Sequence, residues 1–302
     1  MPDRGGWVSS IIFPFASGER EILFQHDYAW DPEIKDLLGG LPFVFPVCAR
    51  ISRSGSEGLY LYDGKQYQLK IHGFSWYEKW TVDNITENSI DIVLRDNKNT
   101  LERYPFKFEV RLKYEVLPGK LRCHQIYKNN ESIRAMPYYA GFHPYFLISD
   151  AVTDFLCANG SPSASDRETQ MHSNIIAAKN SVTINFNSIR RLKYNNTLTD
   201  IIGEQEILKM PSSITNPEIN EQLNILAENK LATLHFPNGD EIKINVTKNP
   251  DYFSYLQLYT IPEKPFFCIE HWMSFPNAMN TVSGVRWLKP NEMETSTYEI
   301  SL

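Results

Sequence analysis

The amino-acid sequence predicts an all-β protein, a large antiparallel β-sandwich with few short helices. Residues 106–116 alternate strictly between apolar and charged side chains, which is the period of a strand with one buried and one solvated face. Asp-Gly and Asn-Gly pairs separate further apolar runs, as they do in tight β-hairpins. The 302 residues also include 17 Phe, 16 Tyr and 6 Trp, and aromatic residues favour strands over helices.

In the first half of the chain, Asp31 begins a predicted short helix that ends at Gly39. Asp is a favoured N-cap, the Pro that follows it fits the first helical turn, and Gly is a common terminator. Asp63-Gly64 is the predicted turn of a hairpin whose strands cover 60–62 and 67–71. Further strands are predicted over residues 90–94, 106–116 and 121–128.

In the second half, the polar residues 158–181, rich in Ser, Ala and Asn, predict a long surface connection. A short helix is predicted near 219–228, and Asn238-Gly239 is the predicted turn between strands over 231–236 and 241–246. The remaining strands are predicted over residues 182–186, 253–260, 266–270 and 297–302. No linker, charge block or repeat divides the chain, so we expect a single domain over residues 1–302.

Composition excludes several classes of function. With 30 Lys and Arg against 36 Asp and Glu, the net charge is −6, and without a basic run nucleic acid is not an expected partner. No apolar stretch approaches the roughly 20 residues of a membrane helix, and Pro14 interrupts the short run over 7–15, so neither a membrane span nor a signal peptide is predicted. Four widely spaced cysteines indicate buried thiols in a reducing compartment, which makes the cytoplasm the expected location.

Three histidines and one acid are candidates for chemistry. His72 opens a His-Gly-Phe run, His143 lies among aromatic residues, and His271 follows Glu270. A histidine among aromatic residues, taken alone, is most often structural, and the spacing of these three matches no common metal motif, so no metal is predicted. Glu270 ends the apolar run 265–269, where burial would raise its pKa toward that of a general base. The alternative is a Glu at the end of a strand that faces solvent.

At these residues the sequence resembles the aldose 1-epimerase family, the galactose mutarotase-like proteins. Six blocks carry the resemblance, and although each is weak alone, they follow one another in the family's order. The blocks cover residues 40–51, 72–74, 141–146, 256–260, 269–280 and 287–290. The resemblance implies a supersandwich of antiparallel strands with an open sugar groove.

The resemblance also implies roles for individual residues, without cofactor or metal. His143 would be the general acid and Glu270 the general base, while Arg50 and His72 would contact sugar hydroxyls. The family's acidic residue before the late hairpin is replaced here by Asn220, which can still bond hydroxyls, or its part is taken by the neighbouring Glu221. Trp76, Tyr145 and Tyr259 could hold the apolar face of the sugar, with core packing as the alternative for each.

The expected function is therefore an isomerase of the aldose 1-epimerase (mutarotase) type, which interconverts the α and β anomers of a hexose by acid/base-catalysed ring opening and closure. The expected partner is a small sugar, bound by a monomer or a homodimer. One alternative is a hexose-6-phosphate mutarotase, which Arg50, Arg53, Lys70 and Lys79 would favour. Others are a non-catalytic carbohydrate-binding β-sandwich and a lyase or hydrolase, which would need a second carboxylate near Glu270. The identity of the sugar stays open.

Overall fold

The computed structural model describes residues 1–26, 31, 39–148 and 164–302. The predicted helix between Asp31 and Gly39 lies almost entirely outside these residues, as does Cys157. The other three cysteines, Cys48, Cys123 and Cys268, are buried and free. Among the helices that the structure describes, none has the length and apolar character needed to cross a membrane.

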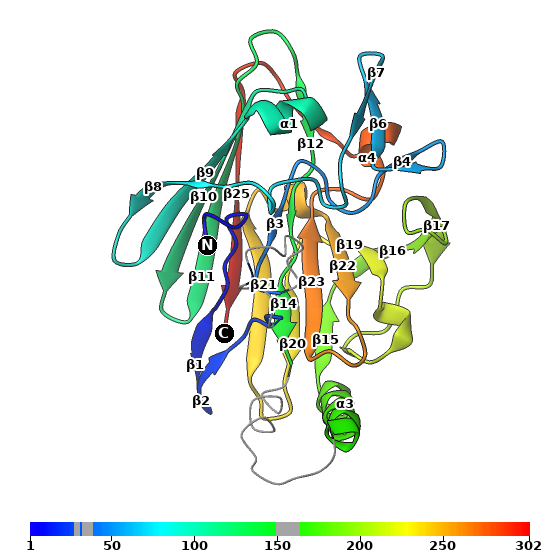
Figure 1. The fold of residues 1–302 in the computed structure, drawn as a ribbon. Coiled ribbons are helices and arrows are strands. Elements are labelled where there is room, and N and C mark those ends of the chain that lie inside the picture. The colour runs from blue at the N-terminus through cyan, green and yellow to red at the C-terminus, as the bar shows by residue number, and fades with distance from the viewer. Residues whose placement is uncertain (27–30, 32–38, 149–163) are drawn as a thin grey trace.

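Two large antiparallel sheets make up most of the molecule (Figure 1). The nine-stranded sheet runs in the order β18 (Ser212–Ser213), β15 (Thr183–Phe186), β20 (Ala232–His235), β21 (Glu241–Lys248), β25 (Met293–Ser301), β11 (Lys120–Asn129), β10 (Phe108–Leu117), β9 (Ser89–Arg95) and β8 (Thr81–Ile85). The eight-stranded sheet runs in the order β17 (Ile201–Gln205), β16 (Ser188–Tyr194), β19 (Gln222–Leu226), β22 (Tyr255–Tyr259), β23 (Phe266–Trp272), β13 (Gly141–Phe142) and β3 (Phe43–Val44), and β14 (Tyr145–Leu147) also pairs with β23.

Smaller elements complete the described chain. Two-stranded sheets join β1 (Ile12–Phe15) with β2 (Gly18–Glu21), β4 (Ser52–Arg53) with β5 (Ser56–Glu57), β6 (Leu59–Tyr62) with β7 (Lys65–Gln68), and β12 (Met136–Tyr138) with β24 (Arg286–Leu288). The helices are α1 (Lys98–Arg103), α3 (Ala164–Asn180) and α4 (Ala278–Thr281), with 3-10 turns η2 (Pro217–Ile219) and η3 (Pro250–Phe253). Figure 1 shows α3 at the opposite end of the sandwich from the β6–β7 hairpin.

The two large sheets pack face to face through aromatic side chains. Phe142 of β13 stacks on Tyr298 of β25, with ring centroids 4.3 Å apart. Phe43 of β3 lies 6.2 Å from Tyr127 of β11, measured between ring centroids. These contacts belong to a single buried cluster that extends through both sheets. The predicted antiparallel β-sandwich is confirmed.

Most predicted strands are confirmed. In β10, Phe108, Val110 and Leu112 are fully buried while the residues between them are partly exposed, so the alternation places one face in the core. The Asp63-Gly64 turn joins β6 to β7, and both residues have the positive φ that such a turn requires (50° and 71°). The second hairpin is β20 and β21, and the other short strands appear as β9, β11, β15, β22, β23 and β25.

Two predicted elements are wrong. Of the surface connection expected over 158–181, residues 158–163 lie outside the described residues and 164–180 form the helix α3. This helix gives little periodic signal because, from Gln170 on, only Ile175 and Lys179 are buried. The helix expected near 219–228 is instead η2 followed by β19. Ile219, Leu223 and Leu226 have helical spacing and are all buried, but β19 pairs on both sides, with β16 and β22, so sheet pairing overrides the helical pattern.

Candidate active site

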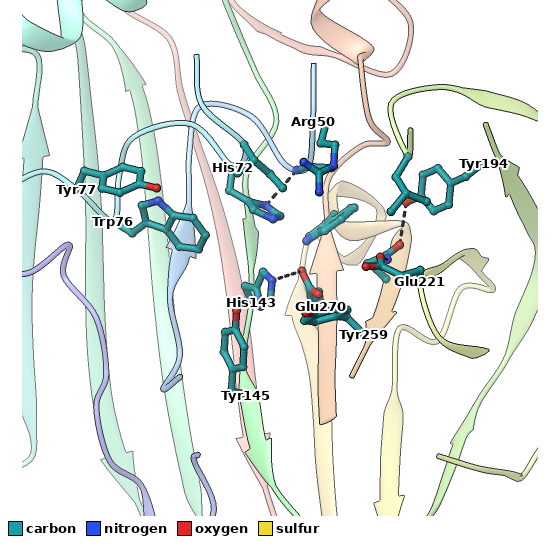
Figure 2. Close-up of a pocket in the computed structure, with 15 residues that line it drawn as sticks. Arg50, His72, Trp76, Tyr77, His143, Tyr145, Tyr194, Glu221, Tyr259 and Glu270 are labelled. Atoms are coloured by element: carbon teal, nitrogen blue, oxygen red, sulfur yellow. Dashed lines mark hydrogen bonds and ion pairs between the residues drawn. The ribbon is translucent and has the colours of Figure 1, made fainter. Parts of the chain in front are cut away.

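A pocket of about 350 Å³ lies against one face of the eight-stranded sheet (Figure 2). Strands β14, β16, β22 and β23 supply part of its lining, and the segments before β4, after β7, between β13 and β14, after β16 and before β19 supply the rest. The residues that line it are Ala49, Arg50, Ile71, His72, Trp76, Tyr77, His143, Tyr145, Tyr194, Leu198, Glu221, Gln257, Tyr259, Glu270 and Trp272.

The alternation of β23 aims Glu270 into the pocket. Glu270 and Trp272, two residues apart, both line the pocket. The intervening His271 points to the opposite face, where its ring lies 6.0 Å from that of Tyr298 in the nine-stranded sheet. Gln257 of β22 is the cross-strand partner of Glu270 and lines the pocket beside it. The strand period therefore places a carboxylate in the pocket and a histidine in the core.

His143 reaches the pocket because the chain around it packs closely against β23. A Cβ atom on Gly141 would lie 2.6 Å from Cδ1 of Trp272, so only glycine allows this approach. The His143 backbone N–H donates to the Pro42 carbonyl at 2.9 Å. Its imidazole stacks on the ring of Tyr145, with centroids 4.7 Å apart and planes 12° from parallel. Backbone and ring contacts thus fix the orientation of the imidazole.

His72 enters the pocket from a tight turn after β7. The residue has a φ of 60° and Gly73 one of 77°, and a Cβ on Gly73 would lie 2.3 Å from the Phe45 carbonyl oxygen. The Ala49 backbone N–H donates to Nδ1 of His72 at 3.1 Å, so the proton of the neutral ring lies on Nε2. The His72 and His143 ring centroids are 5.1 Å apart.

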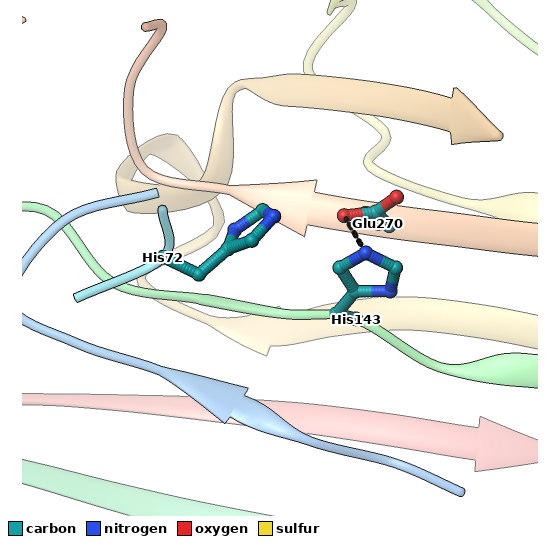
Figure 3. A group of neighbouring side chains, drawn as sticks. All are labelled: His72, His143 and Glu270. Atoms are coloured by element: carbon teal, nitrogen blue, oxygen red, sulfur yellow. Dashed lines mark ion pairs between the residues drawn. The ribbon is translucent and has the colours of Figure 1, made fainter. Parts of the chain in front are cut away.

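His143 and Glu270 form a buried acid–base pair (Figure 3). Nε2 of His143 lies 3.3 Å from Oε2 of Glu270, and the two residues are only 6% and 1% exposed. Burial lowers the pKa of His143 to about 3. Burial also raises the pKa of Glu270 well above its usual value, and the nearby Glu221 carboxylate raises it further. These directions favour a neutral pair in the empty pocket, with the proton on Glu270.

Two atoms of this pair retain hydrogen-bonding capacity. Nδ1 of His143 is buried without a hydrogen-bond partner among the described residues, and the buried Oε2 of Glu270 has no hydrogen bond there beyond its 3.3 Å contact with His143 Nε2. A buried polar atom without a partner is costly, and such atoms in a pocket are available to a ligand. The pair is therefore arranged to exchange hydrogen bonds or protons with a molecule that enters the pocket.

A second carboxylate, Glu221, faces the pair across the pocket. Glu221 immediately precedes β19 and has a φ of 52°. Gln257 Nε2 donates to Glu221 Oε2 at 3.2 Å, and the Tyr194 hydroxyl donates to Gln257 Oε1 at 2.8 Å. Burial raises the pKa of Glu221, while the Arg50 guanidinium lowers it. The result is a polar wall of three linked side chains opposite His143.

Seven of the eight residues expected at a sugar site line this pocket. They are Arg50, His72, Trp76, His143, Tyr145, Tyr259 and Glu270. Asn220 does not line it, because its side-chain oxygen accepts a hydrogen bond from the Thr260 backbone N–H at 2.8 Å, and its neighbour Glu221 lines the pocket instead. The sequence reasoning missed Tyr194 and Gln257. A polar Gln257 between two leucines of an apolar strand was the signal available for it.

The cluster of His72, His143 and Glu270 could also hold a metal ion. One ligand atom from each lies within 4.8 Å of the others, and all three residues are buried. Two imidazoles and a carboxylate are a donor set that suits zinc or ferrous iron. Because Nδ1 of His72 accepts the Ala49 N–H, Nε2 would be its ligand atom.

Backbone strain gathers around the pocket. Ala49, His72, Leu198 and Glu221 all line it, and each has a positive φ between 52° and 60°. This conformation costs a non-glycine residue on the order of 1 kcal/mol, and such residues cluster at functional sites. The strain is independent support for this pocket as the functional site.

Comparisons with known proteins identify the family and agree with the fold. The family model for aldose 1-epimerases matches residues 1–301. The chain is 27% identical over 123 residues to protein LacX of Lactococcus lactis subsp. lactis, a match that spans 40% of each protein. It is 29% identical over 157 residues to a Cenchrus ciliaris protein provisionally named a glucose-6-phosphate 1-epimerase, a match over 48% of this chain and 42% of that protein. The curated relatives are thus matched over less than half of their length.

The fold also resembles that of solved structures. A galactose mutarotase-like protein from Lactobacillus casei ATCC 334 superposes with a TM-score of 0.74 at 19% sequence identity, covering 99% of this chain and 94% of that one. At this identity the likeness concerns the fold alone.

Proposed function

Because the chain belongs to the aldose 1-epimerase family, we propose that it interconverts the α and β anomers of a free hexose in the pocket around Glu270. The observation that carries this proposal is the buried His143–Glu270 pair, with Nε2 and Oε2 3.3 Å apart. Anomerisation needs one proton removed from the C1 hydroxyl and one delivered to the ring oxygen. A neighbouring base and acid perform these two proton transfers, and the pair as a whole gains and loses one proton, so its total charge does not change.

In the proposed reaction, Glu270 is the general base and His143 the general acid. Glu270 takes the proton of the C1 hydroxyl as the C1–O5 bond breaks, and protonated His143 gives its proton to O5. The open-chain aldehyde rotates about C1–C2, and ring closure on the other face returns both protons. Substrate hydroxyls would supply hydrogen bonds to the unpartnered atoms of the pair, which favours the charged form with the proton on His143.

The remaining polar residues of the pocket would hold the sugar. We propose that Arg50, His72 and Glu221 bind hydroxyls, with Glu221 taking the part that the sequence offered to either Asn220 or Glu221. Gln257 and Tyr194 hold Glu221 in place through the two hydrogen bonds described above. Trp76, Tyr145 and Tyr259 would cover the apolar face of the ring.

An unphosphorylated sugar is the substrate that the charges of the pocket favour. Among the described residues of the lining, Arg50 is the one Lys or Arg, and it pairs with Glu57 at 3.1 Å. The other cations considered from the sequence do not line the pocket, and Lys79 pairs with Asp3 at 2.7 Å. The Glu221 carboxylate would repel a phosphate, while the His143–Glu270 pair carries no net charge that would attract one. The name of the Cenchrus ciliaris relative makes a hexose 6-phosphate the second candidate.

We also propose a single chain in the cytoplasm as the working form. All the residues assigned roles come from one copy, so the chemistry needs no second subunit. Three buried free thiols are typical of proteins in a reducing compartment.

The test is NMR exchange spectroscopy on free and phosphorylated aldoses. We expect anomer exchange well above the buffer rate for a free hexose, and a loss of about 10²-fold or more in Glu270→Gln and in His143→Asn, the usual scale for a general acid or base. Faster exchange for the 6-phosphate than for the free sugar would establish the second candidate.

The chain offers a matched control in a second His–Glu pair. His235 Nδ1 lies 3.0 Å from Glu241 Oε1 on the β20–β21 hairpin, outside the pocket. His235→Asn and Glu241→Gln should keep full activity. The proposal fails if the wild type exchanges no aldose faster than buffer, or if either pocket variant stays folded by circular dichroism and fully active.

A further inference from the structure

A second pocket, of about 380 Å³, adjoins the first and shares Arg50 with it. The loop between β16 and β17 forms another common wall. Leu198 lines the first pocket, while its neighbours Thr197 and Thr199 line the second. The two pockets therefore lie on either side of Arg50 and Leu198, close enough for one elongated molecule to occupy both.

The second pocket is rigidly built. Asp200, which lines it, accepts hydrogen bonds from Asn277 Nδ2 at 2.7 Å, from Thr199 Oγ1 at 2.9 Å and from Asn195 Nδ2 at 3.1 Å. Asn277 Oδ1 in turn accepts the Ser52 backbone N–H at 3.0 Å, which ties the opposite wall to the same side chain. A pocket whose walls are fixed in advance loses less conformational entropy when a ligand binds.

The chemistry of the lining fits neutral hydroxyl groups. Thr197, Thr199 and Asn195 offer hydroxyl and amide groups. The charged groups are Arg50, Glu57 and Asp200, so two carboxylates face one guanidinium, and Glu57 already pairs with that guanidinium. A phosphate would meet net negative charge here, whereas sugar hydroxyls can both donate to the carboxylates and accept from the amide.

We propose that the second pocket is a subsite for a further glycosyl unit, so that the preferred substrate is a reducing disaccharide. The reducing ring occupies the pocket around Glu270, and the ring linked to it lies between Arg50 and the 195–200 loop. This inference rests on the proposed function for the position of the reducing ring, but its binding prediction is independent of catalysis.

The test compares sugars that share a reducing glucose. Binding of glucose, maltose and melibiose is measured by NMR titration, so that one monosaccharide is set against a 1,4-linked and a 1,6-linked disaccharide. We expect at least one disaccharide to bind about tenfold more tightly than glucose, which corresponds to about 1.4 kcal/mol. Glucose 6-phosphate is titrated alongside.

Two substitutions in the 195–200 loop distinguish an effect on binding in the second pocket from a general effect of changing this loop. Thr197 is exposed and lines the second pocket, and Asn196 is exposed and lines neither. Thr197→Trp should fill the subsite and lower the ratio of disaccharide to glucose affinity at least fivefold, whereas Asn196→Trp should preserve that ratio.

Each outcome decides the inference. Equal affinities for glucose and both disaccharides overturn it, as does a ratio that Thr197→Trp leaves unchanged. Tighter binding of glucose 6-phosphate than of either disaccharide, lost in Thr197→Trp, would make the second pocket a phosphate site instead. Tight disaccharide binding without anomer exchange in the same samples would support the subsite and reject the proposed function.

Discussion

Burial acts in opposite directions on the two members of the His143–Glu270 pair. It raises the pKa of the carboxyl and lowers that of the imidazole, because neither charge is solvated in the pocket. The pair then holds one proton over a wide pH range. Below that range both groups are protonated and no base remains, and above it both are deprotonated and no acid remains.

At the residue scale, we therefore expect kcat/KM for the free hexose to be flat from about pH 5 to about pH 7. An ordinary histidine titrates near 6.5 in this interval, but burial lowers the pKa of His143 to about 3. Activity should fall only on the alkaline side, when the pair loses its last proton. The profile is measured by NMR exchange with the buffer rate subtracted at each pH. An inflection near pH 6.5 would contradict this assignment of protons.

The same burial predicts that Glu270→Gln stabilises the fold. The unfolded carboxyl ionises near its usual pKa of 4.5, while the folded one stays protonated to higher pH because burial raises its pKa. The folded protein thus binds more protons than the unfolded chain, so this group's contribution to stability is lost as pH rises above 4.5. Glutamine has no ionisable group, so its burial brings no such loss of stability as the pH rises.

Urea unfolding of wild type and Glu270→Gln at pH 5 and pH 8 checks this expectation. The variant should gain free energy of unfolding relative to wild type, and the gain should be larger at pH 8. A gain that does not change with pH would mean that the folded carboxyl is ionised.

Residue-level prediction from sequence worked where the strand period applies. The apolar run before Glu270 indicated a buried carboxyl or a strand-end Glu facing solvent, and the structure shows the buried one. The choice between Asn220 and Glu221 could not be made in this way, because Glu221 has a φ of 52° in a turn and the direction of its side chain depends on that angle. Gln257 could not be predicted as a pocket residue, because its position depends on the cross-strand register that pairs it with Glu270.

At the scale of elements, a buried cation in the second half of α3 helps to hold this helix to the sandwich. Lys179 Nζ donates to Thr260 Oγ1 and to the Ile261 carbonyl, both at 2.7 Å, just after β22. Burial lowers its pKa to about 8. Lysine is rarely so buried, and hydrogen bonds from a charged donor compensate for the lost hydration. From Gln170 on, where the structure describes the side chains of α3, a specific polar contact and not an apolar stripe provides the anchor.

We expect Lys179→Met to cost about 1–3 kcal/mol of unfolding free energy, because it removes the two charge-assisted hydrogen bonds that Lys179 donates to the Thr260 hydroxyl and the Ile261 carbonyl. Urea unfolding gives the global loss, and hydrogen exchange should show the largest loss of protection in α3. Asn174→Ala, at an exposed position of the same helix, is the control and should stay within about 0.5 kcal/mol. Equal effects from the two variants would refute the anchoring role of Lys179.

This anchor also explains why α3 was not predicted. A helix that buries only Ile175 and Lys179 in its second half has no hydrophobic period to detect. In β19 a helical pattern is present without a helix. Its apolar residues have helical spacing, but they are buried in a strand that pairs with β16 on one side and β22 on the other. Local pattern is decisive only where no tertiary pairing competes with it.

At the scale of the whole molecule, the site depends on the contact between the two sheets. Phe142 is fully buried between them, stacks on Tyr298, and immediately precedes His143. We expect Phe142→Ala to cost about 3–5 kcal/mol of unfolding free energy, the usual cost of truncating a core Phe. Anomer exchange should fall as well, since the cavity would loosen the backbone that holds His143.

The half-buried Phe275, outside the contact between the sheets, provides the comparison. Phe275→Ala should cost clearly less in the same urea experiment. Similar losses of unfolding free energy in the two variants would mean that the Phe142–Tyr298 contact stabilises the fold no more than an ordinary apolar contact does.

The sequence predicted such a sandwich from strand number and aromatic content. It did not predict which strands are neighbours, because sheet order depends on pairings between distant segments.

The position of β25 has a consequence for how the protein is made. This strand, the last along the described chain, lies in the interior of the nine-stranded sheet, between β21 and β11. Until the ribosome has released residues 293–301, the strands on either side remain two separate ribbons with open edges. The pocket side of the sandwich can begin to form earlier, but its opposite wall closes only after residues 293–301 have been made. A nascent chain of this protein is therefore exposed to edge pairing with other chains until β25 has been made and inserted.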